Sequence, residues 1–346
     1  MKNLFKTPLS DKIVEIGPGR EDQIIFATET SCDETAAAVI LNGRKVLSNV
    51  VASQIDIHRK YGGVIPEVAA RQHLETINVV IEEAREKAGI KMKDVTAFSG
   101  TVGPGLVGAL LVGLNAAKSL SLIYDKPFIG VNHLNAHVCA NYLESDFAPP
   151  FICLLVSGGH TQLIRVDSYS KQEILGETLD DAVGEAYDKV ARLLGLPYPG
   201  GPYLDKLAQQ GDKEKFKFPE ASVGDYDFSF SGLKTAVLRT CRNFSEEDLQ
   251  KADIAASFQK IVSETLLKKA LKAANKNNIS KIALAGGVAA NSEIRKKFFM
   301  QENKGFTVHA PEFQFCTDNA AMIASGAYFS SNISKDLDIE VFSRMK

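Results

Sequence analysis

The chain has 346 residues, of which 45% are hydrophobic and 24% are charged, and its formal net charge at pH 7 is −2. This length suggests about two globular domains, each large enough to bury a core of its own. A net charge this small excludes a uniformly basic nucleic-acid-binding protein, so any contact with RNA must come from local patches.

The first 23 residues are expected to form a short N-terminal extension. They contain four acidic residues and lack an apolar core segment, which argues against a secretion signal and against a mitochondrial presequence. The longest apolar run, residues 106–114, is far shorter than the ~20 residues of a membrane span. The five cysteines form no close pair, as is typical of a reducing compartment. We therefore predict a cytoplasmic protein without membrane contact.

From residue 24 the chain alternates between short apolar segments and turns. Strands are predicted at residues 24–27, 36–41 and 45–51, where small and β-branched residues are bounded by turn residues. The polar segment 29–35 separates the first two strands, and the Asn-Gly pair at 42–43 favours a hairpin turn.

An amphipathic helix is predicted to follow this hairpin. It should begin near Pro66, because proline is favoured in the first helical turn, and end at Gly89, because glycine favours a helix C-cap. The apolar residues at helical spacing, which we expect on the buried face, are Ala70, Leu74, Ile77, Ile81 and Ala84.

The same plan returns from residue 151. Strands are predicted at 151–156, 161–166 and 173–175, a turn at 157–160 and a helix at 181–194. Further segments alternate between strands and helices, which indicates mixed sheets with crossover helices. The strands are at 95–99, 127–132 and 281–285, and the helices are at 105–124, 252–276 and 319–329.

This repetition predicts an α/β protein of two similar lobes, which we place at residues 24–150 and 151–330, with a C-terminal tail at 331–346. A duplicated, hairpin-led lobe resembles the plan of the actin, hexokinase and Hsp70 (ASKHA) superfamily. That resemblance implies a cleft between the lobes, with the turns at 29–35 and 157–160 on either side of a nucleotide's phosphates.

Two glycine-containing turns are candidates for binding such a ligand. The turn at 157–160 offers small residues whose backbone N–H groups can approach anionic oxygens, although glycine turns are commonly structural. Gly286 and Gly287 follow an apolar strand and precede Asn291, an arrangement that suits an adenosine moiety or a plain strand-to-helix turn.

His133 and His137 form the strongest candidate for a metal site. A four-residue spacing on a helix places both imidazoles on one face, where they either bind a metal or are satisfied by polar neighbours. A zinc protease carries glutamate directly after the first histidine, whereas this chain has Leu134. Any metal here therefore serves another chemistry.

Several acidic residues could complete such a site or bind ligand hydroxyl groups. Asp318 precedes a helix of small residues, so it either caps that helix or adds a carboxylate to a site of two histidines. Asp188 and Asp205 flank a Pro-Gly-Gly-Pro turn and could accept hydrogen bonds from ribose hydroxyls or an ammonium group.

Seven segments together resemble the TsaD family of tRNA N6-adenosine threonylcarbamoyltransferases, where they occur in the same order. The resemblance extends from about residue 24 to residue 326, and its Gly-Leu-Lys-Thr form is that of bacterial members. The segments are ETSCDET (29–35), YGGVIPE (61–67), GPGLVG (103–108), the histidine pair, LVSGGHT (155–161), DFSFSGLKT (227–235) and CTDN (316–319).

The resemblance implies roles for individual residues. His133, His137 and Asp318 are the implied metal ligands, with Fe(2+) as the usual metal and Zn(2+) as a second candidate. Implied to line the pocket for threonylcarbamoyl-AMP are Leu155, Val156, Ser157, Gly158, Gly159, Asp188, Gly201, Asp205 and Asn291.

The implied reaction transfers the threonylcarbamoyl group of threonylcarbamoyl-AMP to N6 of adenosine 37, forming t6A in tRNAs that read codons beginning with A. Because the N6 lone pair is delocalised into the ring, the acyl carbonyl must be polarised, which a metal does as a Lewis acid. Asp33 and Glu34 are candidates for accepting the amine proton, unless Asp33 only orders its turn. The implied partners are a TsaB-like paralogue and a TsaE-like ATPase.

Binding of tRNA requires a local basic surface. Two clusters are candidates, and each is either a solvated helix face or an RNA-binding site. They consist of Lys268, Lys269, Lys272 and Lys276, and of Arg295, Lys296 and Lys297.

Three other functions fit parts of the pattern. An ATP-dependent phosphotransferase of the same fold would have no use for the histidine pair. A zinc endopeptidase lacks its glutamate here, and a non-catalytic partner subunit would not need all three implied ligands.

Overall fold

The structure is a computed structural model that describes residues 16–19, 22–245, 249–329 and 337–344. The chain forms two compact units. The first contains residues 1–56, 64–146 and 318–346, and the second contains residues 57–63 and 147–317. Most of the predicted N-terminal extension lies outside the described residues.

The first unit is built on a mixed five-stranded sheet in the order β3-β2-β1-β4-β5. A β-meander of three antiparallel strands is followed by two strands that run parallel to β1. The strands are β1 (Ile24–Glu29), β2 (Glu34–Leu41), β3 (Lys45–Ser53), β4 (Ala97–Gly103) and β5 (Phe128–Asn132).

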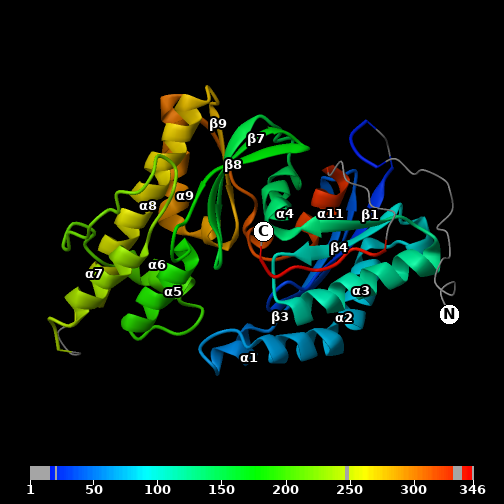
Figure 1. Cartoon of the computed structure of the whole chain (residues 1–346), viewed down its shortest axis with the longest axis horizontal. Helices are drawn as coiled ribbons and strands as arrows, with labels where there is room; N and C mark the ends of the chain where they lie inside the picture. Colours follow the sequence, from blue (N-terminus) through cyan, green and yellow to red (C-terminus); the bar gives the residue numbers. More distant parts are fainter. Residues whose placement is uncertain (1–15, 20–21, 246–248, 330–336, 345–346) are drawn as a thin grey trace. The chain divides into compact units, whose positions relative to one another are not determined.

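Helices cover both faces of this sheet (Figure 1). The helices α2 (Pro66–Ala88) and α3 (Val107–Tyr124) pack against each other and against the strands, and α1 (Ile55–Arg59) precedes them. On the other face lie α4 (His133–Cys139), which leads into a 3-10 turn at Ala140–Tyr142, and α11 (Ala320–Phe329). The sequence-predicted lobe 151–330 assigned α11 to the second half, whereas its contacts group it with the first sheet.

Helix α2 begins and ends where the sequence predicts, but its buried face differs from the prediction. Gly89 adopts a left-handed conformation and closes the helix. The buried positions are Ala69, His73, Ile77, Val80 and Ala84, while Leu74 is 64% exposed. The reason is His73, whose ring is within hydrogen-bond distance of the Thr35 hydroxyl (2.8 Å) and the Cys32 carbonyl (3.0 Å). The buried face of α2 thus contains the polar residue His73, whereas the spacing of apolar residues predicted Leu74 there.

Helix α3 is long and apolar enough, by length and composition, to cross a membrane. In this structure it packs against β1, β4 and α2 as part of the first unit. This arrangement is the one expected of a helix in an α/β unit.

The second unit repeats the sheet plan, in the order β10-β9-β6-β7-β8. Three antiparallel strands are again followed by two strands parallel to the first. The strands are β6 (Phe151–Val156), β7 (Thr161–Ser168), β8 (Lys171–Glu177), β9 (Lys281–Ala285) and β10 (Thr307–His309). The predicted duplicated α/β architecture is therefore confirmed.

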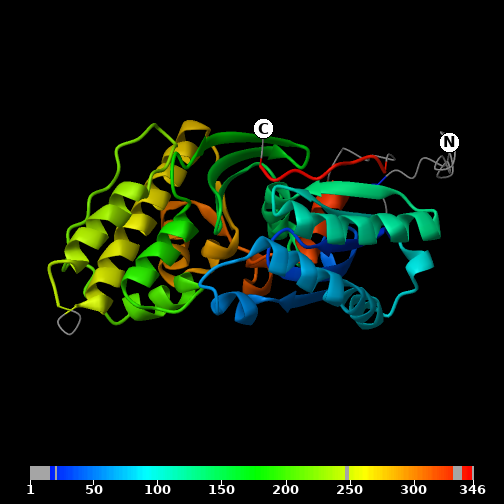
Figure 2. The same cartoon turned by 60° about the horizontal axis from the view of Figure 1, so that its bottom comes forward.

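The helices of the second unit pack around the long helix α8 (Figure 2). Together with β6, β7 and β9 they enclose a core of apolar side chains. The elements are α5 (Val183–Leu193), α6 (Gly200–Ala208), α7 (Ser231–Cys241), α8 (Lys251–Lys276), a 3-10 turn at Gly287–Ala290, α9 (Ser292–Phe299) and α10 (Phe313–Cys316). Short 3-10 turns also occur at Met92–Asp94 and Met300–Lys304.

The last described segment, residues 337–344, returns to the first unit, and we refer to it as the strap. Leu337, Ile339 and Val341 pack against the first core. The backbone N–H of Phe342 donates to the Val102 carbonyl at 3.0 Å, and the Lys118 ammonium group donates to the Ile339 carbonyl at 2.7 Å. The strap therefore covers the C-terminal part of β4.

Candidate metal centre and substrate-binding residues

Helix α4 holds both predicted metal-binding histidines on one face. It begins directly after β5, where the Asn132 side chain caps it by accepting hydrogen bonds from the backbone N–H groups of Leu134 and Asn135. His133 and His137 are both buried, and their ring centroids lie 4.7 Å apart. The cap and the four-residue spacing therefore fix two imidazoles side by side, as predicted.

Asp318 joins the two histidines from the other end of the chain. Its Oδ1 lies 3.1 Å from His137 Nε2 and 3.5 Å from His133 Nε2. Helix α11, which follows it, is buried against β1, β2 and α4, and this packing brings Asp318 to the histidines. The alternative role of helix cap falls to Asn319, whose Oδ1 accepts a hydrogen bond from the Met322 N–H at 3.0 Å.

These three residues fit a single divalent metal. One ligand atom from each lies within 4.8 Å of the others. Two imidazole nitrogens and one carboxylate oxygen suit Fe(2+) or Zn(2+), and a set of three leaves coordination positions open for a substrate. The donor set and its spacing therefore match the predicted cofactor site, while the identity of the metal stays a prediction.

Glu29, at the end of β1, contacts the ring nitrogen of His133 that faces away from Asp318. Its Oε2 lies 3.2 Å from His133 Nδ1 and accepts a hydrogen bond from the Thr101 hydroxyl at 2.5 Å. Its other oxygen accepts a hydrogen bond from the Ser31 N–H. Because a carboxylate only accepts, His133 must carry its proton on Nδ1, which leaves Nε2 for a metal. This role of Glu29 was not predicted from the sequence, where the signal is a carboxylate at the end of an apolar strand.

The charges around His133 and Glu29 stabilise each other. Burial alone would raise the pKa of Glu29, but the charge and hydrogen bond of His133 lower it below its usual value. Burial alone would lower the pKa of His133, but Asp318 and Glu29 raise it from 6.5 to about 9. A metal at Nε2 must therefore displace a tightly held proton.

Of the two candidates for the proton acceptor, Asp33 directly precedes β2 and Glu34 is its first residue. The Ser53 hydroxyl is 3.3 Å from Glu34 Oε1. Burial, followed by the charges of Asp318 and Asp33, raises the pKa of Glu34 to about 10. These effects make Glu34 a weaker acid than usual, and its role as a base stays a prediction.

The second unit carries the predicted substrate-binding turn at residues 157–159. Leu155 and Val156 are buried in β6, and Gly158 and Gly159 are exposed at the turn. The Ser157 N–H donates to the His160 carbonyl at 2.8 Å, and the His160 N–H donates to the Ser157 hydroxyl at 3.1 Å. These bonds close the turn, in which both glycines are exposed.

Gly184 allows helix α5 to start directly against this turn. Its N–H donates to the Ser157 carbonyl at 3.2 Å. A Cβ at position 184 would lie 2.6 Å from the Ser157 carbonyl oxygen and 2.8 Å from the Gly158 Cα. Glycine is therefore required for this close approach.

The remaining predicted pocket residues form two hydrogen-bonded groups. Asp188 Oδ1 accepts hydrogen bonds from the backbone N–H groups of Gly200 (2.7 Å) and Gly201 (3.3 Å). Asp205 and Asn291 both bond to Gln259 on α8, at 2.9 and 3.0 Å. Gln259, which the sequence analysis missed, is buried in the middle of a long amphipathic helix, so no local signal marks it.

Other acidic residues near this segment have structural partners. Asp180 accepts hydrogen bonds from the backbone N–H groups of Phe230 (2.8 Å) and Ser231 (3.3 Å) at the start of α7. Asp181 pairs with Lys189 (2.8 Å) and Lys234 (2.9 Å). Asp180 and Asp181 therefore help to hold the segment at 227–235 in place.

The predicted basic surface is weaker than the sequence suggests. Lys268 pairs with Glu220, and both Lys272 and Lys276 pair with Asp225. Lys269 is buried, and its ammonium group donates to the carbonyls of residues 223 and 224. Acidic residues about 50 positions upstream therefore neutralise much of the positive charge on this face of α8.

Comparison with known proteins shows which family this chain resembles. A family model described as TsaD, tRNA N6-adenosine threonylcarbamoyltransferase, matches residues 45–325. The tRNA N6-adenosine threonylcarbamoyltransferase of Clostridium perfringens (strain SM101 / Type A) is 55% identical over 322 residues, covering 90% of this chain and 95% of that protein. The protein of the same name from Thermosipho africanus is 53% identical over 329 residues, covering 93% and 99%.

Solved structures share the fold at low sequence identity. Full-length HypF in its phosphate- and nucleotide-bound form aligns with a TM-score of 0.63 and 14% identity, over 91% of this chain and 47% of that chain. The (R)-2-hydroxyglutaryl-CoA dehydratase component A of Acidaminococcus fermentans aligns with a TM-score of 0.52 and 15% identity, over 90% and 98%. These similarities show the fold alone. The family match and the close relatives together establish that the chain belongs to the TsaD family.

Proposed function

We propose that this protein transfers the threonylcarbamoyl group of threonylcarbamoyl-AMP to N6 of adenosine 37 in tRNAs that read codons beginning with A, forming t6A. The observation that carries the proposal is the cluster of His133, His137 and Asp318, within 4.8 Å, in a chain that matches the TsaD family model. A phosphotransferase of the same fold would have no use for this donor set.

We propose Fe(2+) as the bound metal, with Zn(2+) as the alternative. A divalent cation on His133, His137 and Asp318 would act as a Lewis acid toward the carbonyl of the acyl donor. Glu29 contributes by holding His133 with Nε2 available, and the burial of both histidines excludes water from the ligand nitrogens. The bond that forms joins the carbonyl carbon to N6, and the bond that breaks releases AMP.

For the adenylate we propose the residues of the second unit named above. The exposed turn at 157–159 offers backbone N–H groups to a phosphate. Asp188, Asp205 and Asn291 offer hydrogen-bonding groups to the ribose and adenine. The proton released from N6 goes to Asp33 or Glu34, and a bound cation would favour the ionised Glu34 by offsetting the charge of Asp318.

As partners we propose a TsaB-like paralogue and a TsaE-like ATPase, and as location the cytoplasm. Exposed apolar side chains on the outer helices of the first unit support a protein partner. They are Leu74 and Val79 on α2, and Val107, Leu111, Leu122 and Ile123 on α3.

The proposed activity is tested by nucleoside analysis. The protein and its partners are incubated with tRNA, ATP, threonine, bicarbonate and an enzyme that forms the adenylate, and the digested tRNA is analysed by mass. We expect threonylcarbamoyladenosine with the wild type and with Asp94→Ala, an exposed residue of the first unit, but not with Asp318→Ala. Absence of product with the wild type contradicts the proposal.

A further inference from the structure

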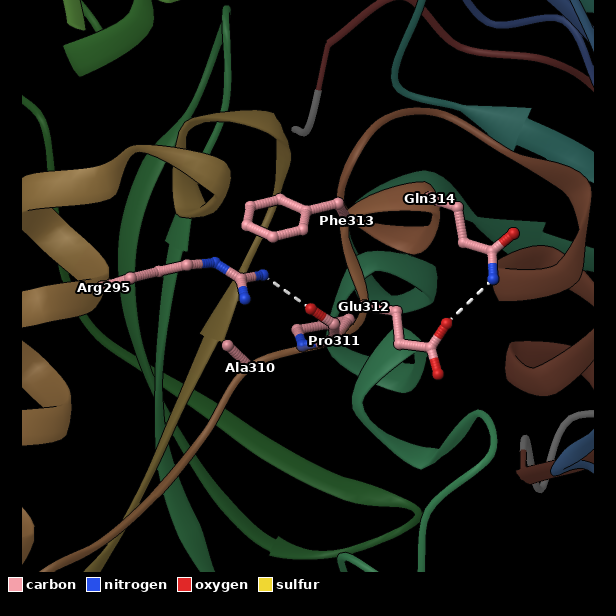
Figure 3. A pocket seen from close by; sticks show the side chains of 6 residues that line it. All are labelled: Arg295, Ala310, Pro311, Glu312, Phe313 and Gln314. Carbon is pink, nitrogen blue, oxygen red and sulfur yellow. Dashed lines mark hydrogen bonds between the residues drawn. The ribbon is translucent and has the colours of Figure 1, made fainter.

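An open pocket of about 530 Å³ is lined by residues of the second unit (Figure 3). Arg295 on α9 and the segment 310–314, which leads into α10, line it. Phe313, the first residue of α10, is 65% exposed, which is more than any core position of the unit. An aromatic ring left this open is a contact surface for a ligand when something holds it in place.

Arg295 holds this ring. Its guanidinium carbon lies 4.2 Å from the Phe313 ring centroid, as expected for a cation–π contact. The guanidinium is itself fixed, since Nε donates to the Ala289 carbonyl at 2.8 Å and Nη2 donates to the Pro311 carbonyl at 2.6 Å. Phe313 is thus a preorganised flat surface, and a ligand that stacks on it need not order the side chain first.

The polar groups beside the ring indicate what kind of ligand fits. Glu312 accepts a hydrogen bond from the Gln314 amide at 2.9 Å, and both residues are among those that line the pocket (Figure 3). The charges of Arg295 and Glu312 are opposite, so the pocket has no net charge. The Glu312 carboxylate repels a phosphate but accepts hydrogen bonds from an exocyclic amine. A neutral nucleobase has this combination of a flat face and an amine.

We propose that this pocket binds an unpaired nucleobase of the substrate tRNA, which stacks on Phe313 and is contacted at its edge by Glu312 and Gln314. The proposal rests on the proposed function, whose RNA substrate presents unstacked loop bases. Such bases are commonly recognised by aromatic and arginine side chains. Only four residues separate Phe313 from Asp318, and a chain of that length spans at most about 18 Å.

The adenine of threonylcarbamoyl-AMP is the rival source of a base. The residues proposed for it, Asp205 and Asn291, bond to Gln259 on α8 rather than to the segment 310–314. The large exposure of Phe313 also favours a base that arrives from solvent on a long polymer. The experiment below separates the two sources.

The test uses the full-length protein and a synthetic tRNA anticodon stem-loop with 2-aminopurine beside adenosine 37. Stacking of the probe on Phe313 should quench its fluorescence. We expect Phe313→Ala to weaken stem-loop binding about tenfold or more and to abolish the quenching, while Phe313→Trp restores both. Phe299→Ala, an exposed phenylalanine of α9 outside the pocket lining, is the matched control and should bind like the wild type.

Each outcome decides between the sources. If Phe313→Ala weakens binding of AMP and leaves stem-loop binding intact, the pocket belongs to the adenylate and the proposal is overturned. If it changes neither, Phe313 only covers Arg295, and the proposal is also overturned. The catalytic function is tested separately, because a wild type that forms no threonylcarbamoyladenosine fails irrespective of Phe313.

Discussion

The hydrogen bonds of Glu29 predict that its replacement by glutamine weakens metal binding. The wild-type carboxylate accepts from three donors, which are the Ser31 N–H, the Thr101 hydroxyl and His133 Nδ1. The glutamine amide has one acceptor oxygen. Because the Ser31 N–H can only donate, that oxygen must face Ser31, and the NH₂ group then faces Thr101 and His133. The Thr101 hydroxyl can rotate to accept, whereas His133 can accept only after its proton moves to Nε2.

A proton on Nε2 occupies the atom that binds the metal. Loss of such a supporting partner typically costs 10- to 100-fold in metal affinity. This range corresponds to about 1.4 to 2.8 kcal/mol of binding free energy. The fold should tolerate the change, because the Ser31 and Thr101 contacts persist and the side chain keeps its size.

The assay is competition between metal-stripped protein and a chromophoric chelator for Zn(2+), with the His133 tautomer read by ¹H–¹⁵N NMR above pH 9, where the ring of the metal-free protein is neutral. We expect Glu29→Gln to lose at least tenfold in affinity and to move the His133 proton to Nε2. Glu82→Gln is the matched control, because Glu82 lies exposed on α2 and pairs with Arg85. Unchanged affinity and an unchanged tautomer in Glu29→Gln would refute the assigned role.

Three further predictions concern other parts of the two units. The pKa of His133 is raised from 6.5 to about 9, so metal affinity should increase with pH across this range. In the metal-free protein, the stability that this proton contributes is fully present below pH 6.5 and should be lost as pH rises toward 9. A chelator titration measures the affinity and thermal unfolding measures the stability at each pH, and an affinity that does not change with pH would contradict the raised pKa. Gly184→Ala should destabilise the protein by about 1 to 3 kcal/mol, as measured by denaturant unfolding, and should weaken AMP binding, as measured by calorimetry. Gly232→Ala is the control and should do neither, because a Cβ at position 232 would lie in open space. Loss of a lysine that contacts tRNA should make tRNA binding less dependent on salt. Because Asp225 pairs with Lys272, we expect Lys296→Ala to lose more of the salt dependence than Lys272→Ala. A larger loss in Lys272→Ala would show that Asp225 does not neutralise Lys272.

Short sequence patterns correctly predicted the features that depend on neighbouring residues, namely the ends of α2 and the histidine face of α4. Pro66 and the left-handed Gly89 bound α2 because both act through their own backbone conformation. The spacing of His133 and His137 placed both rings on one face for the same reason. The pattern near residue 318 left Asp318 as either a helix cap or a third ligand, and the resemblance to a family implied the second role.

What sequence reasoning missed depends on pairs of residues far apart in the chain. His73 is buried because Thr35 and Cys32, about 40 residues earlier, offer it hydrogen bonds. The spacing of apolar residues along a helix cannot predict a hydrogen-bond partner so far away in the chain. Lys269 was expected on a basic surface, but carbonyls about 45 residues upstream hold it inside. Glu29 looked like part of a turn until His133 was placed 104 positions away beside it.

The division of the chain has a consequence for the order in which the protein can assemble during synthesis. The second unit occupies one long stretch, residues 147–317, apart from residues 57–63, whereas the first needs residues from both ends. A chain emerging from the ribosome can therefore complete most of the second unit before Asp318, α11 and the strap exist. His133 and His137 are made long before Asp318, which begins the last segment of the first unit. A metal that needs all three residues could therefore be bound only after residue 318 has been made.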